Sequence, residues 1–211
     1  MKFDGCMELK QIFIQLCRAY CKDETIVNSY WNEIEKKYSG RKRHYHNLTH
    51  LKFLIQQLKE CKHLVADWDT ILFSVFYHDI IYDVLKSNNE ERSAELAEKR
   101  LLMADFPDDK TTLCREQILA TKSHIYSNNN DTNLFTDADL SILGQPPDVY
   151  EEYYHQIRKE YSIFPDLIYN PGRKKVINHF LEMEKIFKTD HFFAKYEQQA
   201  RINLKAEFSR L

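Results

Sequence analysis

The pair of residues in this chain most suited to chemistry is His78-Asp79, in the apolar stretch of residues 73–82. At helical spacing Asp79 shares a face with Val75 and Tyr82, so its carboxylate is expected among apolar side chains. A buried carboxylate needs a hydrogen-bond or cationic partner. An Arg, a Lys or a metal ion could be that partner, and the adjacent His78 favours a metal.

Further candidate ligands lie on both sides of this pair. His46 and His50 stand four residues apart, a spacing at which two histidines on one helical face can bind a metal. Later in the chain, Asp139 is a second carboxylate among apolar residues, whereas the nearby Asp137 could cap a helix. The spacing therefore indicates a metal site built from separate segments.

The elements that must position these residues are predicted to be helices. Four glycines and five prolines in 211 residues, with many Leu, Ile, Lys, Glu and Gln, are typical of an all-α protein with short connections. Apolar periodicity and capping residues predict helices over residues 7–21, 23–38, 47–58, 67–83, 88–101, 109–126, 134–143, 147–161, 173–187 and 191–208. The third and fourth can run antiparallel, which would bring His50 to face His78 and Asp79.

The length of the chain suits one domain. We expect residues 1–40 to be N-terminal packing helices, residues 41–145 to form the metal-site core, and residues 146–211 to add C-terminal helices. The polar residues 127–133 are expected to form a surface loop, and the basic residues 173–175 to be mostly solvated.

Composition excludes several classes of protein. A net charge of −2 argues against general nucleic-acid binding. We find no signal-peptide pattern and no apolar run of membrane-spanning length, so we expect a cytoplasmic protein without a membrane partner. Five scattered cysteines, an odd number, indicate reduced thiols.

The order His50, His78-Asp79, Asp139 resembles the HD superfamily of metal-dependent phosphohydrolases. A bacterial branch described as predicted metal-dependent HD superfamily phosphohydrolases is similar in four motifs: Arg43-x-Tyr45-His46-Asn47-x-x-His50, Tyr77-His78-Asp79-x-x-Tyr82, Asn89-Glu90-x-x-Ser93 and Asp137-x-Asp139-Leu140-x-x-Leu143-Gly144. The segment Glu197-x-x-Ala200-Arg201-x-Asn203-Leu204 extends the resemblance over residues 41–204. The resemblance implies an HD-domain-like helical bundle with its ligands in the interior.

The resemblance also implies roles for individual residues. It assigns His50, His78, Asp79 and Asp139 as metal ligands, with Asp137 as an alternative to Asp139. The candidate catalytic residues are Asp79, His46 and Glu90, and the candidate substrate contacts are Arg43, Tyr45, Asn47, Tyr82, Asn89, Ser93 and His124, with Lys122 and Arg173 as secondary phosphate candidates. His46 and His124 match no universal ligand, so each could instead serve a second metal. Such a ligand set suits one or two divalent ions of Mn, Ni, Fe, Co, Zn or Mg.

The activity implied by the resemblance is hydrolysis of a nucleotide or another small phosphate ester by a metal-activated water, in a phosphomonoesterase or phosphodiesterase. Two alternatives stay open. One is an HD-type di-iron oxygenase acting on a small polyol or phosphonate-like substrate, and the other is a non-catalytic metal- and nucleotide-binding module. A homodimer contact through residues 1–40 also stays open.

Overall fold

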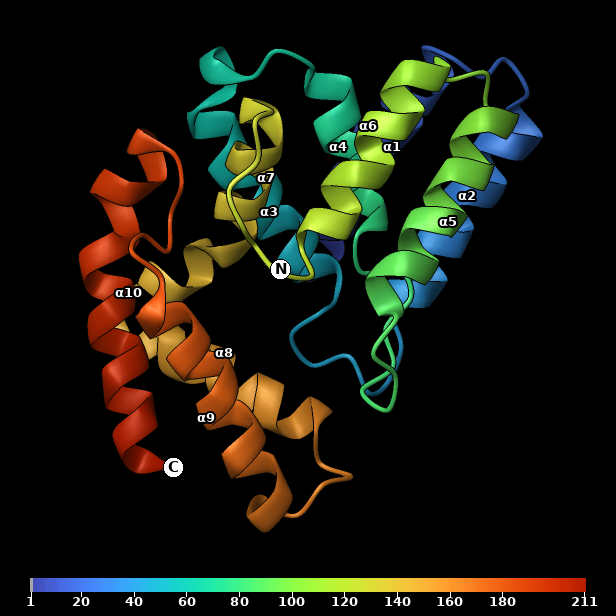
Figure 1. Cartoon of the computed structure of the whole chain (residues 1–211). Coiled ribbons are helices and arrows are strands. Elements are labelled where there is room, and N and C mark those ends of the chain that lie inside the picture. The colour runs from blue at the N-terminus through green and yellow to red at the C-terminus, as the bar shows by residue number, and fades with distance from the viewer. Residues whose placement is uncertain (1) are drawn as a thin grey trace.

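The computed structural model describes the backbone of residues 2–211 and side chains from Cys6 onward, and it confirms the all-α prediction (Figure 1). Ten α-helices and two 3-10 helices make up the described part, without a strand. They are α1 (Lys2–Arg18), α2 (Glu24–Tyr38), α3 (Leu48–Glu60), η1 (Lys62–Leu64), α4 (Trp68–Tyr77), α5 (Asn89–Met103), α6 (Asp108–Ala120), α7 (Asn130–Leu140), η2 (Ser141–Gly144), α8 (Pro147–Glu160), α9 (Asp166–Glu182) and α10 (Asp190–Arg210). Within residues 2–211, no helix is long and apolar enough to cross a membrane.

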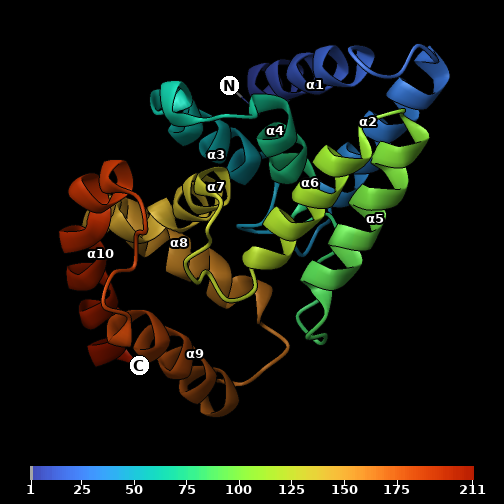
Figure 2. The same cartoon turned by 45° about the horizontal axis from the view of Figure 1, so that its top comes forward.

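Helix α4 is the centre of the bundle and packs against α3, α5, α6 and α7. All of its residues from Thr70 to Tyr77 are buried, as expected for a helix surrounded by others. Helix α2 lies beside α5 and α1 crosses from α2 to α3, while α8, α9 and α10 form a separate layer beyond α7 (Figures 1 and 2). The end of α4, where His78 lies, is therefore at the junction of the two parts.

A close contact joins the C-terminal layer to the rest of the bundle. A Cβ atom at Gly144, at the end of η2, would lie only 2.5 Å from the Cβ of Tyr196 in α10. Glycine at this position therefore permits the two backbones to approach. Asn203 reinforces the contact, because its side-chain amide donates to the carbonyls of Leu143 and Gln145 at 2.8 Å each.

The prediction that the fourth helix continues to residue 82 or 83 is wrong, because α4 ends at Tyr77. The backbone N–H of Asp79 donates to the Tyr38 hydroxyl at 3.2 Å instead of to a carbonyl one turn earlier. That carbonyl, of Val75, lies 2.9 Å from His78 Nδ1. Side chains therefore satisfy the backbone groups that would have continued the helix, and His78 and Asp79 lie at its end.

The prediction of a surface loop over residues 127–133 is also wrong from residue 130 onward, where α7 begins. Asn129 caps the helix by accepting the N–H of Thr132 at 3.0 Å. Asp131 is buried and accepts the N–H groups of Ala66 and Asp67 at 2.9 and 2.7 Å. The polar side chains here bind backbone within the fold, so their polarity does not indicate exposure.

The boundaries of two further helices differ from the predictions. Helix α6 ends at Ala120, six residues early, and His124 beyond it has a positive φ of 54°. Helix α9 spans Asp166–Glu182 and continues through Pro171, where a helix over residues 173–187 was predicted. An interior proline costs a helix about 3 kcal/mol. The buried stripe Tyr169, Arg173 and Ile177, at four-residue spacing, crosses the proline and offsets that cost.

Candidate metal centre

Three segments bring the predicted ligands together. His50 Nε2, from α3, lies 3.1 Å from His78 Nε2 and 3.3 Å from Oδ1 of Asp139, which is on α7. Asp79 Oδ2 lies 3.1 Å from His78 Nε2 and 3.8 Å from His50 Nε2. Two atoms that each coordinate one ion at about 2.1 Å are about 3 Å apart when adjacent. The group formed by the buried His50 and His78 and the partly exposed Asp139 could therefore hold a metal ion, with Asp79 beside it.

The histidine rings are oriented suitably for such an ion. Because His78 Nδ1 lies 2.9 Å from the Val75 carbonyl, its proton is expected on Nδ1, which leaves the lone pair of Nε2 directed at His50 and the carboxylates. The two buried Nε2 atoms and the nearby carboxylate oxygens then converge on one point. Without a cation or a proton between them these atoms would repel one another, so the donor set fits a divalent ion.

The charges at the site also favour a cation. Burial by itself would lower the pKa of His78, but the charge of Asp79 and the hydrogen bond to it raise that pKa to about 9. Burial lowers the pKa of His50. Although burial opposes it, the neighbouring histidines lower the pKa of both Asp79 and Asp139. Both carboxylates are therefore ionised at neutral pH.

The structure separates the roles of Asp137 and Asp139. Asp137 is fully buried, and its polar partners are Lys188 and Thr189. Its carboxylate accepts the N–H groups of Lys188 and Thr189 and the Thr189 hydroxyl at 2.8–3.0 Å, and Lys188 Nζ lies 2.9 Å away. Asp137 thus fixes the segment that leads into α10 and does not cap a helix, while Asp139 lies with His50 and His78.

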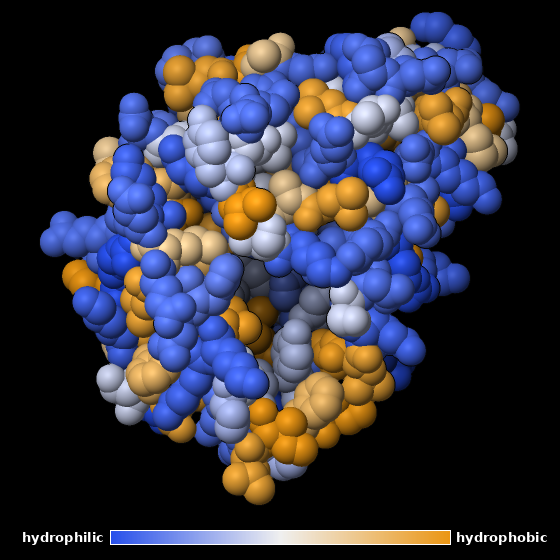
Figure 3. All heavy atoms as spheres, in the orientation of Figure 1, coloured by the Kyte–Doolittle hydropathy of each residue, from blue (hydrophilic) through white to orange (hydrophobic). Residues whose placement is uncertain are grey.

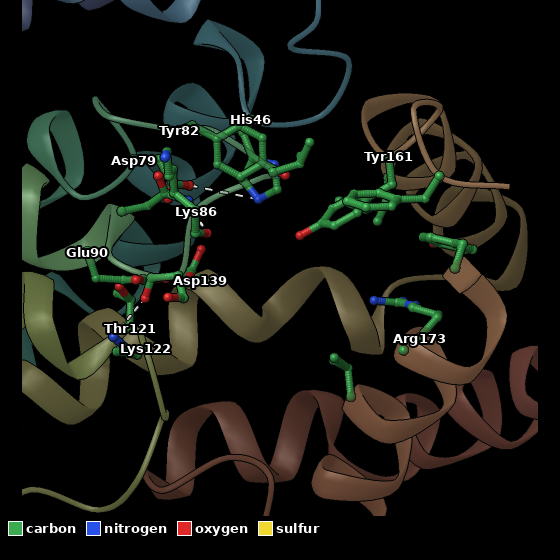
Figure 4. A pocket seen from close by; sticks show the side chains of 18 of the residues that line it. His46, Asp79, Tyr82, Lys86, Glu90, Thr121, Lys122, Asp139, Tyr161 and Arg173 are labelled. Carbon is green, nitrogen blue, oxygen red and sulfur yellow. Dashed lines mark hydrogen bonds and ion pairs between the residues drawn. The ribbon is translucent and has the colours of Figure 1, made fainter. Parts of the chain in front are cut away.

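Glu160, at the end of α8, is a site residue that the sequence analysis missed. One of its oxygens accepts the N–H groups of Tyr45 and His46 at 2.8 and 2.9 Å. The other lies 2.6 Å from His46 Nδ1 and accepts the Tyr82 hydroxyl at 2.9 Å. The only sequence signal was its place three residues after the buried Ile157, on the inward face of the helix. Glu160 orients His46, whose Nε2 lies 3.9 Å from Asp79 Oδ2 (Figure 4).

Glu160 should make the stability of the protein depend on acid pH. Burial by itself would raise its pKa, but the His46 side chain and the backbone N–H groups lower it from 4.5 to about 2. The ionised Glu160 therefore contributes its full stabilisation to the folded state above about pH 4.5, and this contribution is lost as the pH falls towards 2. Glu160→Gln should remove about 2–3 kcal/mol from the pH-dependent part of the free energy of unfolding.

Urea unfolding between pH 3 and 6 would measure the effect on the free energy of unfolding. Glu152→Gln, at an exposed position of the same helix, is the matched control and should keep the wild-type slope. An equally steep acid dependence in Glu160→Gln would contradict the assigned role.

The structure gives Arg43 a different role from the predicted phosphate contact. Its guanidinium donates to the backbone carbonyls of His46, Asp79 and Ile80 at 3.0, 2.7 and 3.0 Å. It also lies over the rings of Tyr38 and Tyr82, at 4.8 and 5.4 Å from their centroids. Arg43 thus ties the His46 segment to the turn that carries Asp79, and three of its N–H donors bind backbone carbonyls.

Three other predicted substrate contacts also bind the backbone. Asn47 caps α3 by accepting the N–H of Thr49 at 2.8 Å. Asn89 bonds the N–H and carbonyl of Asp83, and the buried Ser93 bonds both backbone groups of Ile81. The Tyr45 hydroxyl is buried and has no hydrogen-bond partner among the described residues. These residues shape the site, and of them only Asn89 lines the cavity described next.

A cavity of about 560 Å³ opens onto the centre, and it is visible as the hollow in the middle of the surface (Figure 3). The predicted site residues that line it are His46, Asp79, Tyr82, Asn89, Glu90, Lys122, His124, Asp139 and Arg173. His50 and His78 lie behind these, almost fully buried. His124 Nε2 lies 3.1 Å from Asp139 Oδ2, on the side opposite His50. The carboxylates of the centre thus face the cavity, and two histidines support them from within.

The comparisons with known proteins add no relative to this description. No protein-family model, curated protein or solved structure was found to match the chain. The likeness to the HD superfamily therefore stays a prediction that rests on the motifs in the sequence.

Proposed function

We propose that the protein is a metal-dependent phosphohydrolase of the HD type, acting on a small phosphate ester. The observation that supports this most is the convergence of His50, His78, Asp79 and Asp139 at the inner wall of an open cavity. These four residues would hold a divalent ion. Such an ion, when bound, lowers the pKa of water and polarises a phosphoryl group.

His46 is placed to move a proton. Glu160 holds its Nδ1, so that the proton-carrying Nε2 is directed at Asp79 and the cavity. Burial by itself would lower the pKa of His46, but the charge of Asp79 and the hydrogen bond and charge of Glu160 raise it above its usual value. His46 can therefore donate a proton to the leaving oxygen of an ester, with Glu160 keeping the ring in place.

The phosphate would be held at the cavity mouth by a lysine that the sequence analysis did not consider. Lys122 is paired with Glu91, and Arg173 is paired with Glu207. Lys86 lines the same cavity, is exposed, and has no ion-pair partner in the part of the chain that the structure describes. Figure 4 shows it among the side chains that line the cavity. Lys86 is therefore our candidate for the contact with the phosphate charge.

Asp79→Asn tests both the metal and the activity. We expect the variant to lose at least about hundredfold in metal affinity and in phosphatase turnover, because a charged ligand becomes a neutral amide. Its far-ultraviolet circular dichroism should stay near wild type, because the backbone of Asp79 keeps its bonds to Tyr38 and Arg43. Elemental analysis and a panel of phosphate esters would provide the measurements.

Asp109→Asn, exposed on α6, serves as the control and should behave as wild type. Wild-type metal content in Asp79→Asn would refute the ligand assignment. Failure of the metal-replete wild type to hydrolyse any ester of the panel would refute the proposed activity.

A second candidate is the di-iron oxygenase, favoured by one observation. His124 Nε2 lies by the Asp139 oxygen that does not face His50, and together His124 and Asp139 would provide ligands for a second ion. Two bound irons per chain, with loss of one in His124→Ala, would favour this chemistry. One divalent ion per chain in both proteins would favour hydrolysis.

A further inference from the structure

The cavity continues beyond the metal centre, between α8 and α9, into a part with a different lining. The residues there are mainly aromatic and aliphatic: Tyr153, Ile157, Tyr161, Phe164, Tyr169 and Val176. The Tyr161 ring centroid lies 5.8 Å from that of Tyr169. In Figure 4 Tyr161 points across the cavity towards the side that holds His46 and Asp139. A ligand that reaches the carboxylates thus has an apolar, ring-lined wall beside it.

One buried cation lies in this wall. Arg173 is about nine-tenths buried, and its Nε and Nη2 donate to the two oxygens of Glu207 at 2.7 and 2.9 Å. These two hydrogen bonds do not use the Nη1 protons of Arg173. The end of the guanidinium group points into the cavity (Figure 4). Because Glu207 neutralises the charge, Arg173 offers hydrogen-bond donors without a net positive charge. Such a group suits a neutral acceptor better than a second anion.

We propose that this end of the cavity binds a flat, uncharged heteroaromatic ring of the nucleobase type, which makes the substrate a nucleotide. The ring would stack on the tyrosine side chains and accept a hydrogen bond from Arg173. The inference rests on the proposed function for the phosphate end of the ligand. The ring site itself belongs to α8 and α9 and needs no metal. The cavity volume lies within the range of small-molecule sites.

Gly172 provides a way to fill this part of the cavity. It lines the cavity, and a Cβ atom there would meet nothing within 4 Å. Gly172→Leu therefore places a side chain in open space next to Arg173 without a clash in the helix. Asn178→Leu introduces the same side chain at an exposed position of α9 that does not line the cavity. The two variants form a matched pair.

The test measures binding to the metal-free protein by calorimetry. The probes are the 5′-monophosphates of adenosine, guanosine, cytidine and uridine, with ribose 5-phosphate as the ligand that lacks a base. We expect at least one nucleotide to bind about tenfold or more tightly than ribose 5-phosphate, from stacking of the base. Gly172→Leu should remove most of that difference, and Asn178→Leu should keep it.

Equal affinity of the wild type for ribose 5-phosphate and all four nucleotides, or absence of nucleotide binding, would overturn the ring site. So would a preference that survives Gly172→Leu. The phosphohydrolase proposal fails separately: a nucleotide preference in a protein that hydrolyses no ester after metal loading keeps the ring site and removes the activity. Hydrolysis of an ester by a protein that shows no preference for a base keeps the phosphohydrolase activity and removes the ring site.

Discussion

Asp139→Asn is expected to lower the affinity of the protein for a divalent metal by about hundredfold or more while leaving the chain folded. Its Oδ1 lies 3.3 Å from His50 Nε2 and 3.8 Å from His78 Nε2, among the converging ligand atoms. The amide removes the negative charge and replaces one oxygen with a donor. The shape of the side chain is kept, and its amide oxygen can still accept a hydrogen bond from His124.

Metal content after dialysis against a chelator, together with circular dichroism, would measure this outcome. The exposed Asp109→Asn variant again serves as the control for a charge change alone. A folded Asp139→Asn protein that retains the metal would show that the centre does not depend on this carboxylate. An unfolded variant would show that Asp139 is structural.

Asp137→Asn is expected to have the opposite pattern, a loss of about 3–5 kcal/mol in the free energy of unfolding with the metal centre intact. Asp137 is fully buried, accepts hydrogen bonds from Lys188 and Thr189, and pairs with Lys188 Nζ. An amide in its place leaves the lysine charge unpaired and sets an N–H group against donors. The folded fraction should still bind metal at the wild-type ratio.

Urea unfolding gives the change in stability, and Thr189→Val gives a scale for it. That variant removes only the hydroxyl bond of 2.8 Å to Asp137, so it should cost about 1 kcal/mol. A stable Asp137→Asn protein that lacks metal would mean that the two carboxylates have exchanged roles.

Much of the bundle follows from local patterns. The stripe Val27, Tyr30, Trp31 and Ile34 predicts α2, and Asp23 caps it by accepting the N–H of Thr25 at 2.8 Å. Local sequence patterns gave wrong helix boundaries where a polar group binds a partner that is remote in the sequence. The helix of His78 was predicted too long because the Tyr38 hydroxyl, from another helix, binds Asp79, and no periodicity reports such a bond.

The candidate site, like the fold, could be predicted only in part. The apolar surroundings of Asp79 and Asp139, with His50 and His78, indicated a group of buried ligands, and the structure brings these four side chains together. Glu160 could not be placed there from the sequence, because it lies 114 residues from His46. Arg173 was expected at the surface because its neighbours are lysines, and its partner Glu207 lies 34 residues later.

The sequence by itself determined the all-helical class and the residue types that could hold a metal. Helical period and capping are properties of neighbouring residues, so they can be read from a short segment. Only the tertiary structure decided that Asp139 faces the histidines while Asp137 binds Lys188, and that Arg43 is tied to backbone carbonyls. The physical reason is that a buried charge takes the nearest partner in space, and that partner comes from a segment remote in the chain.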